Sequence, residues 1–213
     1  MLARGLIEAQ RATLEVVRRL EGEVRPGRTE WQLAQRAEEL AREAGADRFW
    51  TPVAVGAGAG ALVCHPEFPP GDRVVGDDDL VLLDVTPELG GWPGDVTRTV
   101  LVGDDPGRRH VLDEVTRIER ALLRACRPGM PANELFAQAR ELFDEVGFEL
   151  LDLLGNIGHD LHEGGRVRHF IDPRTDAPMW GCWAIEPHLG LDGIAAKVED
   201  LVFLEEDRVV VLD

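Results

Sequence analysis

The order of apolar and polar positions predicts the same pair of helices twice along the chain. Apolar residues recur at intervals of three and four over residues 25–45 and again over residues 127–147, and both segments open with Arg-Pro-Gly and close with Gly. A further helical pattern precedes each segment, over about 3–21 and about 107–125. At an offset of 102 residues (25 to 127), the positions shared with the second segment are Arg25, Pro26, Gly27, Ala37, Glu39, Leu40, Glu43 and Gly45. We therefore expect an internal repeat.

Short strand-like segments with glycine turns follow each helical pair. They begin at residues 50–55 in the first copy and at residues 148–151 in the second. No change of composition separates the two copies. The pattern predicts one α+β domain over residues 1–213, made of similar halves at about 1–105 and 106–213, with the strands facing one another and the helices outside.

Acidic residues flank a predicted hairpin turn in the first half. Asp84 ends an apolar run, and Asp95 opens a β-prone run after a segment rich in Gly and Pro. If the turn centres on Leu89-Gly90, the two carboxylates lie opposite each other in an antiparallel pair. Like charges in that position repel each other, so their placement calls for a reason.

The repeat predicts a second acidic pair. The offset of 102 leads from Asp84 to Glu186, and a symmetric turn at Asp192-Gly193 places Glu199 opposite Glu186. The second hairpin is two residues longer, which preserves the face because strand side chains alternate with a period of two. We therefore expect four carboxylates on one inner sheet surface.

Composition and charge exclude several classes of protein. Hydrophobic residues make up 44% of the chain, which suits a sizeable core, and the formal net charge of −17 argues against binding to nucleic acid or to an anionic membrane. Three cysteines at irregular spacing favour reduced thiols. The N-terminus becomes charged too early for a signal peptide, and no apolar run is long enough to span a membrane. We expect a cytoplasmic protein.

Four converging carboxylates would be unstable without compensating charge. Protonation, arginine partners or metal ions could supply it, and two divalent cations would neutralise all four. Oxygen ligands with an added imidazole favour Mn²⁺, with Co²⁺, Zn²⁺ or Fe²⁺ as alternatives. Histidines cluster at His159, His162 and His169 in a Gly-rich segment, and His65 lies at the corresponding place in the first half. Two such ions could hold a bridging hydroxide that attacks a carbonyl group.

These residues resemble the pita-bread metallopeptidases, which include aminopeptidase P, prolidase, methionine aminopeptidase and the creatinase relatives. Members carry two Asp eleven residues apart with the second in an Asp-x-Thr-Arg-Thr-like run, as at Asp84 and Asp95. They also carry Ile-Glu-Pro, here residues 185–187, and a late strand similar to Arg-Ile-Glu-Asp, here Lys-Val-Glu-Asp at residues 197–200 with Glu199. A Gly-rich segment ending in His65 precedes the first Asp. The Thr-Arg-Thr and Val-Glu-Asp motifs are more similar to those of the aminopeptidase P and prolidase branch than to those of the methionine aminopeptidase branch.

In the family that this chain resembles, a second active-site His normally follows the metal-binding His by seven residues. His159 and His162 are only three residues apart, which leaves three alignments open. In the first, His159 is the metal ligand and the loop to His162 is shortened, with His162 in the substrate role. In the second, which follows the methionine aminopeptidase pattern, His162 keeps that role and Gly155 falls in the ligand position. In the third, His162 is the ligand and His169 follows seven residues later. We favour the first.

The sequence also departs from the family pattern. Lys197 replaces the usual Arg before Glu199, and Val85-Thr86 replaces the common x-Gly after the first Asp. Both departures bear on substrate specificity more than on metal binding. Aminopeptidase P and prolidase usually carry an additional N-terminal domain, and this chain corresponds to the catalytic unit alone. Strict specificity for proline at the second position is therefore left open.

The resemblance implies a dinuclear metal-dependent exopeptidase, an Xaa-Pro aminopeptidase or dipeptidase that acts on short peptides. Glu186 would also move a proton, while His65 and His162 would position the substrate and stabilise charge. The alternatives are a binding module without catalysis and a creatinase-like hydrolase of a non-peptide C–N bond. A homodimer is the expected assembly. The predicted ligands of the two ions are Asp84, Asp95, His159, Glu186 and Glu199.

Overall fold

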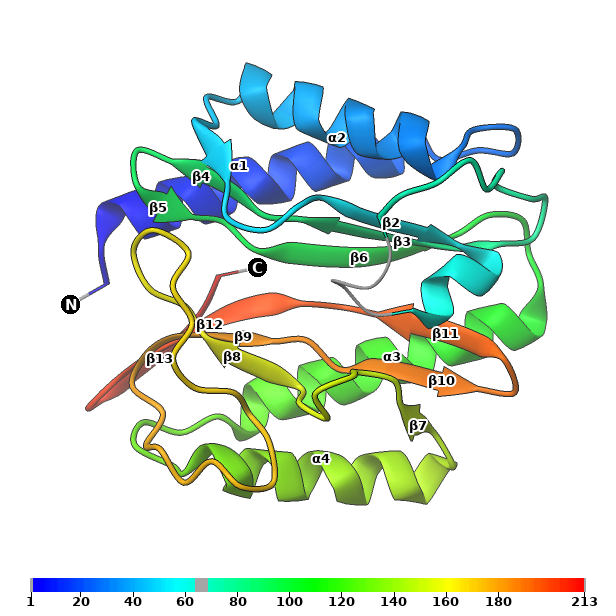
Figure 1. Ribbon diagram of the computed structural model, residues 1–213. Coiled ribbons are helices and arrows are strands. Elements are labelled where there is room, and N and C mark those ends of the chain that lie inside the picture. The colour runs from blue at the N-terminus through cyan, green and yellow to red at the C-terminus, as the bar shows by residue number, and fades with distance from the viewer. Residues whose placement is uncertain (1, 64–68, 213) are drawn as a thin grey trace.

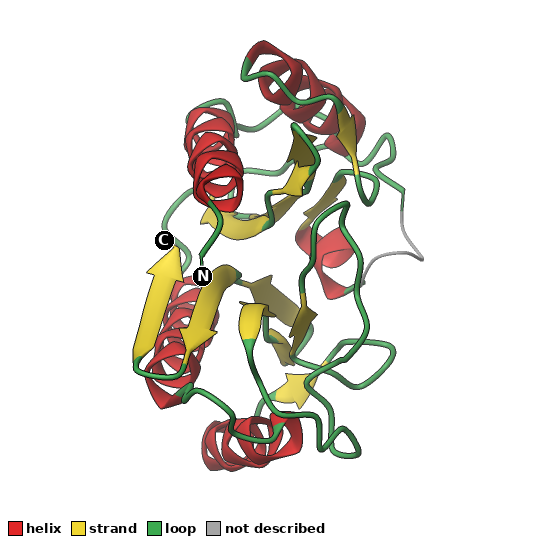
Figure 2. Cartoon of the chain, turned by 90° about the vertical axis from the view of Figure 1, so that its left-hand side faces the viewer, coloured by secondary structure: helices red, strands yellow, loops and turns green. Residues whose placement is uncertain are grey.

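The computed structural model describes residues 2–63 and 69–212 of the chain. Helices line its two outer sides, and the strands lie between them (Figures 1 and 2). The α-helices are α1 (Arg4–Glu21), α2 (Glu30–Glu43), α3 (Pro106–Ala125) and α4 (Ala132–Val146). Each buries an apolar stripe, so the helices predicted from apolar periodicity are confirmed.

Local capping interactions define where these helices begin and end. The Thr29 hydroxyl accepts a hydrogen bond from the Gln32 backbone N–H, and the Gln32 side chain accepts one from the Thr29 N–H, both at 3.1 Å. Asp105 accepts from the Arg108 N–H at 2.8 Å at the start of α3. Gly147 ends α4 in the left-handed conformation with φ 72°, which favours glycine.

The strands before α3 form two small antiparallel sheets. One has the order β2-β3-β6 and the other β1-β4-β5. A 3-10 helix, η1, follows β2. The elements are β1 (Arg48–Phe49), β2 (Ala54–Ala57), η1 (Gly58–Leu62), β3 (Leu80–Val85), β4 (Pro87–Leu89), β5 (Trp92–Pro93) and β6 (Val96–Leu101).

The strands after α4 repeat this arrangement on the other side of the molecule. One sheet has the order β13-β12-β9-β8 and the other β11-β10-β7. The elements are β7 (Glu149–Leu150), β8 (Gly158–Asp160), β9 (Gly181–Ile185), β10 (His188–Leu191), β11 (Ile194–Lys197), β12 (Asp200–Glu205) and β13 (Arg208–Leu212).

The first acidic hairpin has a register two residues away from the prediction. Asp84 pairs with Thr97, not with Asp95. The turn centres on Gly90 and Gly91, whose φ values of 56° and 83° suit a tight two-residue hairpin that only residues tolerant of positive φ form readily. Because the shift is even, Asp84 and Asp95 still share a face.

The second hairpin has the predicted register. Ile185 pairs with Asp200, and His188 pairs with Lys197, so Glu186 and Glu199 lie where the two ladders meet. The turn is Asp192-Gly193, and both residues have positive φ.

Two apolar cores lie behind the facing sheets, and polar contacts join the halves. One core packs beneath α1 and α2, and the other beneath α3 and α4. Between them, the Glu199 N–H donates to the Thr97 carbonyl at 3.1 Å, and the Arg98 guanidinium donates to the Glu199 carbonyl at 2.6 Å. Cys126 and Cys182 are buried free thiols, while Cys64 lies outside the described residues.

None of the helices in residues 2–63 and 69–212 combines the length and the apolar character that crossing a membrane requires.

Candidate metal centre

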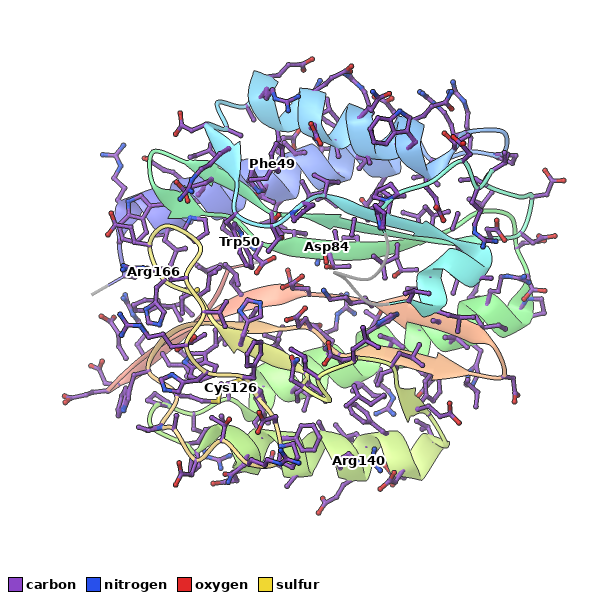
Figure 3. The ribbon with its side chains drawn as sticks, in the orientation of Figure 1. Phe49, Trp50, Asp84, Cys126, Arg140 and Arg166 are labelled. Carbon is purple, nitrogen blue, oxygen red and sulfur yellow. The ribbon has the colours of Figure 1, made fainter. Side chains whose placement is uncertain are left out.

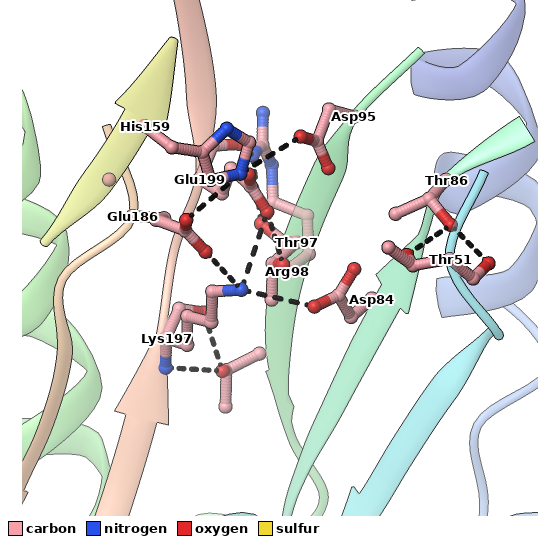
Figure 4. Close-up of polar contacts among 12 residues, drawn as sticks. Thr51, Asp84, Thr86, Asp95, Thr97, Arg98, His159, Glu186, Lys197 and Glu199 are labelled. Atoms are coloured by element: carbon pink, nitrogen blue, oxygen red, sulfur yellow. Dashed lines mark hydrogen bonds and ion pairs between the residues drawn. The ribbon is translucent and has the colours of Figure 1, made fainter. Parts of the chain in front are cut away.

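The predicted ligands meet at one pocket between the two sheet layers. Asp84 lies near the end of β3 and Asp95 directly before β6, while Glu186 follows β9 and Glu199 lies between β11 and β12. His159 lies in β8. All five line a pocket of about 270 Å³, and Figures 3 and 4 show Asp84 pointing from its sheet toward the facing strands. The four carboxylates thus converge on one pocket, as strand alternation predicted, and whether they bind a metal stays a prediction.

His159 faces the acidic residues through its Nε2 atom. That atom lies 3.2 Å from Glu186 Oε1 and 3.7 Å from Asp95 Oδ2. Its Nδ1 atom lies 3.0 Å from the Asp160 carbonyl, which can only accept a hydrogen bond, so the Nδ1 atom carries the proton. The Nε2 atom is therefore the ring nitrogen that would offer its lone pair to a metal ion in the pocket.

Two buried carboxylate oxygens here have no hydrogen-bond partner among the described residues. They are Asp95 Oδ2 and Glu199 Oε1, on residues that are 2% and 1% exposed. One ligand atom from each of Asp95, His159 and Glu199 lies within 4.8 Å of the others. Buried anionic oxygens without donors are costly, and a cation would stabilise them. The donor set of carboxylates and one imidazole suits Mn²⁺, Fe²⁺, Co²⁺ or Zn²⁺.

Lys197 also belongs to this centre, although no sequence motif indicated it. Its ammonium lies 2.6 Å from Glu186 Oε2, 3.0 Å from Asp84 Oδ2 and 3.5 Å from Glu199 Oε2 (Figure 4). Lys197 precedes Glu199 by two residues, so strand alternation already placed both on one face. This two-residue spacing is the sequence feature from which the position of Lys197 beside Glu199 could have been predicted.

Burial and mutual repulsion shift the pKa values of the cluster. Burial raises the pKa of Asp95 well above its ordinary value, and the charges of Glu199 and other carboxylates raise it further. Burial likewise raises the pKa of Glu199 to about 8, although Lys197 opposes the shift. Burial lowers the pKa of Lys197, but its carboxylate neighbours outweigh that effect and raise it well above the usual value. The single ammonium thus leaves the pKa values of Asp95 and Glu199 raised, and a divalent cation would stabilise the ionised form of both carboxylates.

The other two clustered histidines bind a different acid. His162 Nε2 lies 3.0 Å from Asp160 Oδ2, and His169 Nδ1 lies 2.8 Å from the same oxygen. His162 is absent from the described residues that line the pocket. This geometry supports the alignment with His159 as the ligand. The substrate role of His162 stays a prediction, and His65, the other predicted catalytic histidine, lies outside the described residues.

Apolar and small polar side chains form the walls of the pocket. Trp50 and Phe170 flank the His159 ring, with ring centroids 5.8 and 6.3 Å from it in edge-to-face geometry. Asn156 also lines the pocket, and its Oδ1 atom accepts from the Gly158 N–H at 3.0 Å. The sequence did not predict these wall residues. They come from different segments of the chain, and no local motif indicates which side chains will line a pocket in the folded protein.

The paired α+β halves enclose an acidic, histidine-bearing pocket to which both halves contribute side chains, and this donor set is that of a candidate metal-binding protein. The chain belongs to metallopeptidase family M24, whose model matches residues 4–206. The predicted pita-bread fold is confirmed by solved structures: the prolidase from Pyrococcus furiosus matches with a TM-score of 0.89 at 22% identity over 100% of this chain and 64% of that one. The dipeptidase PepE from Mycobacterium ulcerans matches with a TM-score of 0.87 at 27% identity, over 98% and 57%.

Curated relatives carry related names. An Xaa-Pro dipeptidase from Lactobacillus delbrueckii subsp. lactis is 30% identical over 70% of this chain and 41% of its own length. One from Pyrococcus furiosus is 27% identical over 87% of this chain and 53% of its own length. The chain thus spans about half the length of the curated relatives it matches.

Proposed function

We propose that the protein is a metal-dependent exopeptidase that cleaves short peptides, with Xaa-Pro dipeptides as the first substrates to test. One observation carries the proposal: Asp95, His159 and Glu199 converge in a pocket, and two of their buried oxygens have no donor among the described residues. Family membership and the names of the Xaa-Pro dipeptidases above support the substrate class.

The residues divide the chemistry between them. A bound divalent ion would supply Lewis-acid chemistry, which lowers the pKa of water and polarises a carbonyl group. His159 and the carboxylates of Asp95 and Glu199 would hold it. Glu186, whose Oε1 atom lies 3.2 Å from His159 Nε2, would accept the proton of the attacking water and pass it to the leaving amine.

The pocket walls favour a small substrate. A pocket of about 270 Å³ lined by Trp50, Val167 and Phe170 suits an apolar or prolyl side chain of a short peptide. His65 and His162 remain the predicted residues for positioning the substrate. The prediction of two ions with a bridging hydroxide, and the prediction of a homodimer, are separate from this proposal.

Metal dependence of hydrolysis tests the proposal. We expect the protein to cleave Xaa-Pro dipeptides with Mn²⁺, to lose activity on chelation, and to regain it with Mn²⁺, Co²⁺ or Zn²⁺. Tripeptides, Met-initiated peptides and guanidino compounds complete the substrate panel. Asp95→Asn should lower kcat/KM by at least about 100-fold, because it removes a ligand charge. Asp113→Asn, on the exposed face of α3, is the matched control. No bound metal and no turnover on any compound would contradict the proposal.

A further inference from the structure

Lys197 places a positive charge among three of the four carboxylates that were predicted to hold two ions. Its Nζ atom lies within 3.0 Å of an oxygen of Glu186 and of Asp84, and 3.5 Å from Glu199 Oε2. Figure 4 shows the ammonium between the strands that carry these acids. Lys197 is only 8% exposed, so solvent does not screen these contacts appreciably.

The remaining acidic oxygens form a second, separate position. Asp95 Oδ2 and Glu199 Oε1 have no hydrogen-bond partner among the described residues. Asp95 Oδ2 lies 3.7 Å from His159 Nε2, and one ligand atom from each of Asp95, His159 and Glu199 lies within 4.8 Å of the others. Glu199 Oε2, in contrast, already accepts a hydrogen bond from the Thr97 hydroxyl at 2.6 Å. The cluster thus divides into one position filled by an ammonium and one that lacks a cation partner from the protein.

We propose that the Lys197 ammonium fills one of the two cation positions, so that the resting protein binds one divalent ion, at Asp95, His159 and Glu199. This inference rests on the proposed metal-dependent function and revises the number of ions predicted from the sequence. Lys197 is a positioning residue: by holding Glu186 Oε2, it turns Glu186 Oε1 toward His159 and the ion position.

The backbone of Lys197 is fixed, which limits how far its side chain can withdraw. The Lys197 N–H donates to Thr99 Oγ1 at 3.0 Å, and the Thr99 hydroxyl donates to the Lys197 carbonyl at 2.8 Å. On its other side, Lys197 pairs with His188 in the β10–β11 ladder. A second ion at Asp84 and Glu186 would therefore leave the ammonium buried without its partners, which is costly.

Counting Mn²⁺ ions tests the inference. We expect about one Mn²⁺ per wild-type chain by calorimetry and elemental analysis, with the electron paramagnetic resonance spectrum of an isolated ion. Lys197→Met keeps the length of the side chain and removes the charge, so it should bind about two and show a coupled pair. Arg73→Met is the matched control, because it removes a cation beside buried Glu30 outside the pocket, and it should still bind one.

The wild-type protein offers a second measurement that needs no variant to fold. Lys197 is the only lysine of the sequence, so lysine labelled with ¹³C at Cε reports on this side chain alone. During titration with Zn²⁺, we expect its signal to stop changing at one equivalent. A second change between one and two equivalents, two Mn²⁺ bound by the wild type, or one bound by Lys197→Met would overturn this inference and leave the proposed function standing. A wild type that binds no divalent ion would overturn both.

Discussion

At the scale of single residues, His188 shows how burial determines a protonation state. Its Nε2 atom donates to the Ala61 carbonyl at 2.7 Å, and burial is the main cause that lowers its pKa from 6.5 to about 4. The unfolded chain therefore takes up a proton before the folded protein does. The stability that the neutral ring contributes is complete above pH 6.5 and is lost as the pH falls toward 4, by about 3 kcal/mol in total.

Substitution of this ring tests the linkage. We expect His188→Gln to flatten the decline in the free energy of unfolding between pH 7 and pH 4.5, because an amide can keep the bond to Ala61 without titrating. Urea denaturation of the metal-free protein at several pH values measures this slope. His110→Gln, on the exposed side of α3, should keep the wild-type slope. Equal slopes for the wild type and His188→Gln would contradict the assignment.

The sequence predicted the convergence of four carboxylates but not the ammonium group that lies among them. Asp84, Asp95, Glu186 and Glu199 follow from the repeat and from strand alternation, both of which are visible in one chain. Lys197 obeys the same alternation, but a long side chain can direct its charge inward or toward solvent. That choice depends on the carboxylates contributed by other strands, which only the folded arrangement brings within 2.6 to 3.5 Å.

At the scale of elements, Asp160 holds the segment that follows β8. Its Oδ1 atom accepts from the backbone N–H groups of Arg168 and His169 at 2.7 and 3.0 Å, and its Oδ2 atom is bonded by the rings of His162 and His169. The loop therefore closes on a single buried carboxylate. This contact shapes the segment in which the spacing of His159 and His162 departs from the family pattern.

Removing that charge tests the organising role of Asp160. We expect Asp160→Asn to lower the free energy of unfolding by about 1–3 kcal/mol, because the amide nitrogen cannot accept from either histidine ring. Proteolysis within residues 162–169 should become faster than in the wild type. Chemical denaturation and limited trypsin digestion measure the two effects, with exposed Asp176→Asn as the control. An unchanged cleavage rate at Arg166 and Arg168 would count against this role.

Helices and hairpins differed in how far the sequence determined them. Apolar periodicity is a local signal, so α1 and α3 were predicted to within a residue or two at each end. The first hairpin was wrong by two residues, because its register depends on the Gly90-Gly91 turn and on the short β4–β5 ladder. Several Gly and Pro residues in that segment are compatible with more than one turn position. The pairing of β4 with β5 determines which turn forms.

At the scale of the whole molecule, the two halves meet through polar contacts at the repeat offset. The Thr97 hydroxyl donates to Glu199, and the Arg98 guanidinium donates to Asp200, and in both cases the residues are 102 positions apart. Equivalent strands of the two halves thus contact each other directly. The candidate metal centre lies at this junction, so a bound ion would connect both halves and stabilise them together.

Loss of one contact at the junction should therefore weaken both halves equally. Thr99→Val removes a hydroxyl that bonds both the N–H and the carbonyl of Lys197, and leaves these groups buried without it. We expect the free energy of unfolding to fall by about 1–3 kcal/mol. Hydrogen exchange should report the same loss for the slowest amides of α2, in the first half, and of α4, in the second, because each core depends on the other.

Thr116→Val is the matched control for this experiment. Its hydroxyl donates to the Leu112 carbonyl within α3, so its loss removes one hydrogen bond of the same chemistry without touching the junction. We expect a smaller change in the free energy of unfolding than for Thr99→Val. A loss of protection confined to α4 in Thr99→Val would show that the halves unfold separately, and the contacts between β6 and residues 197–200 would then join them without coupling their stability.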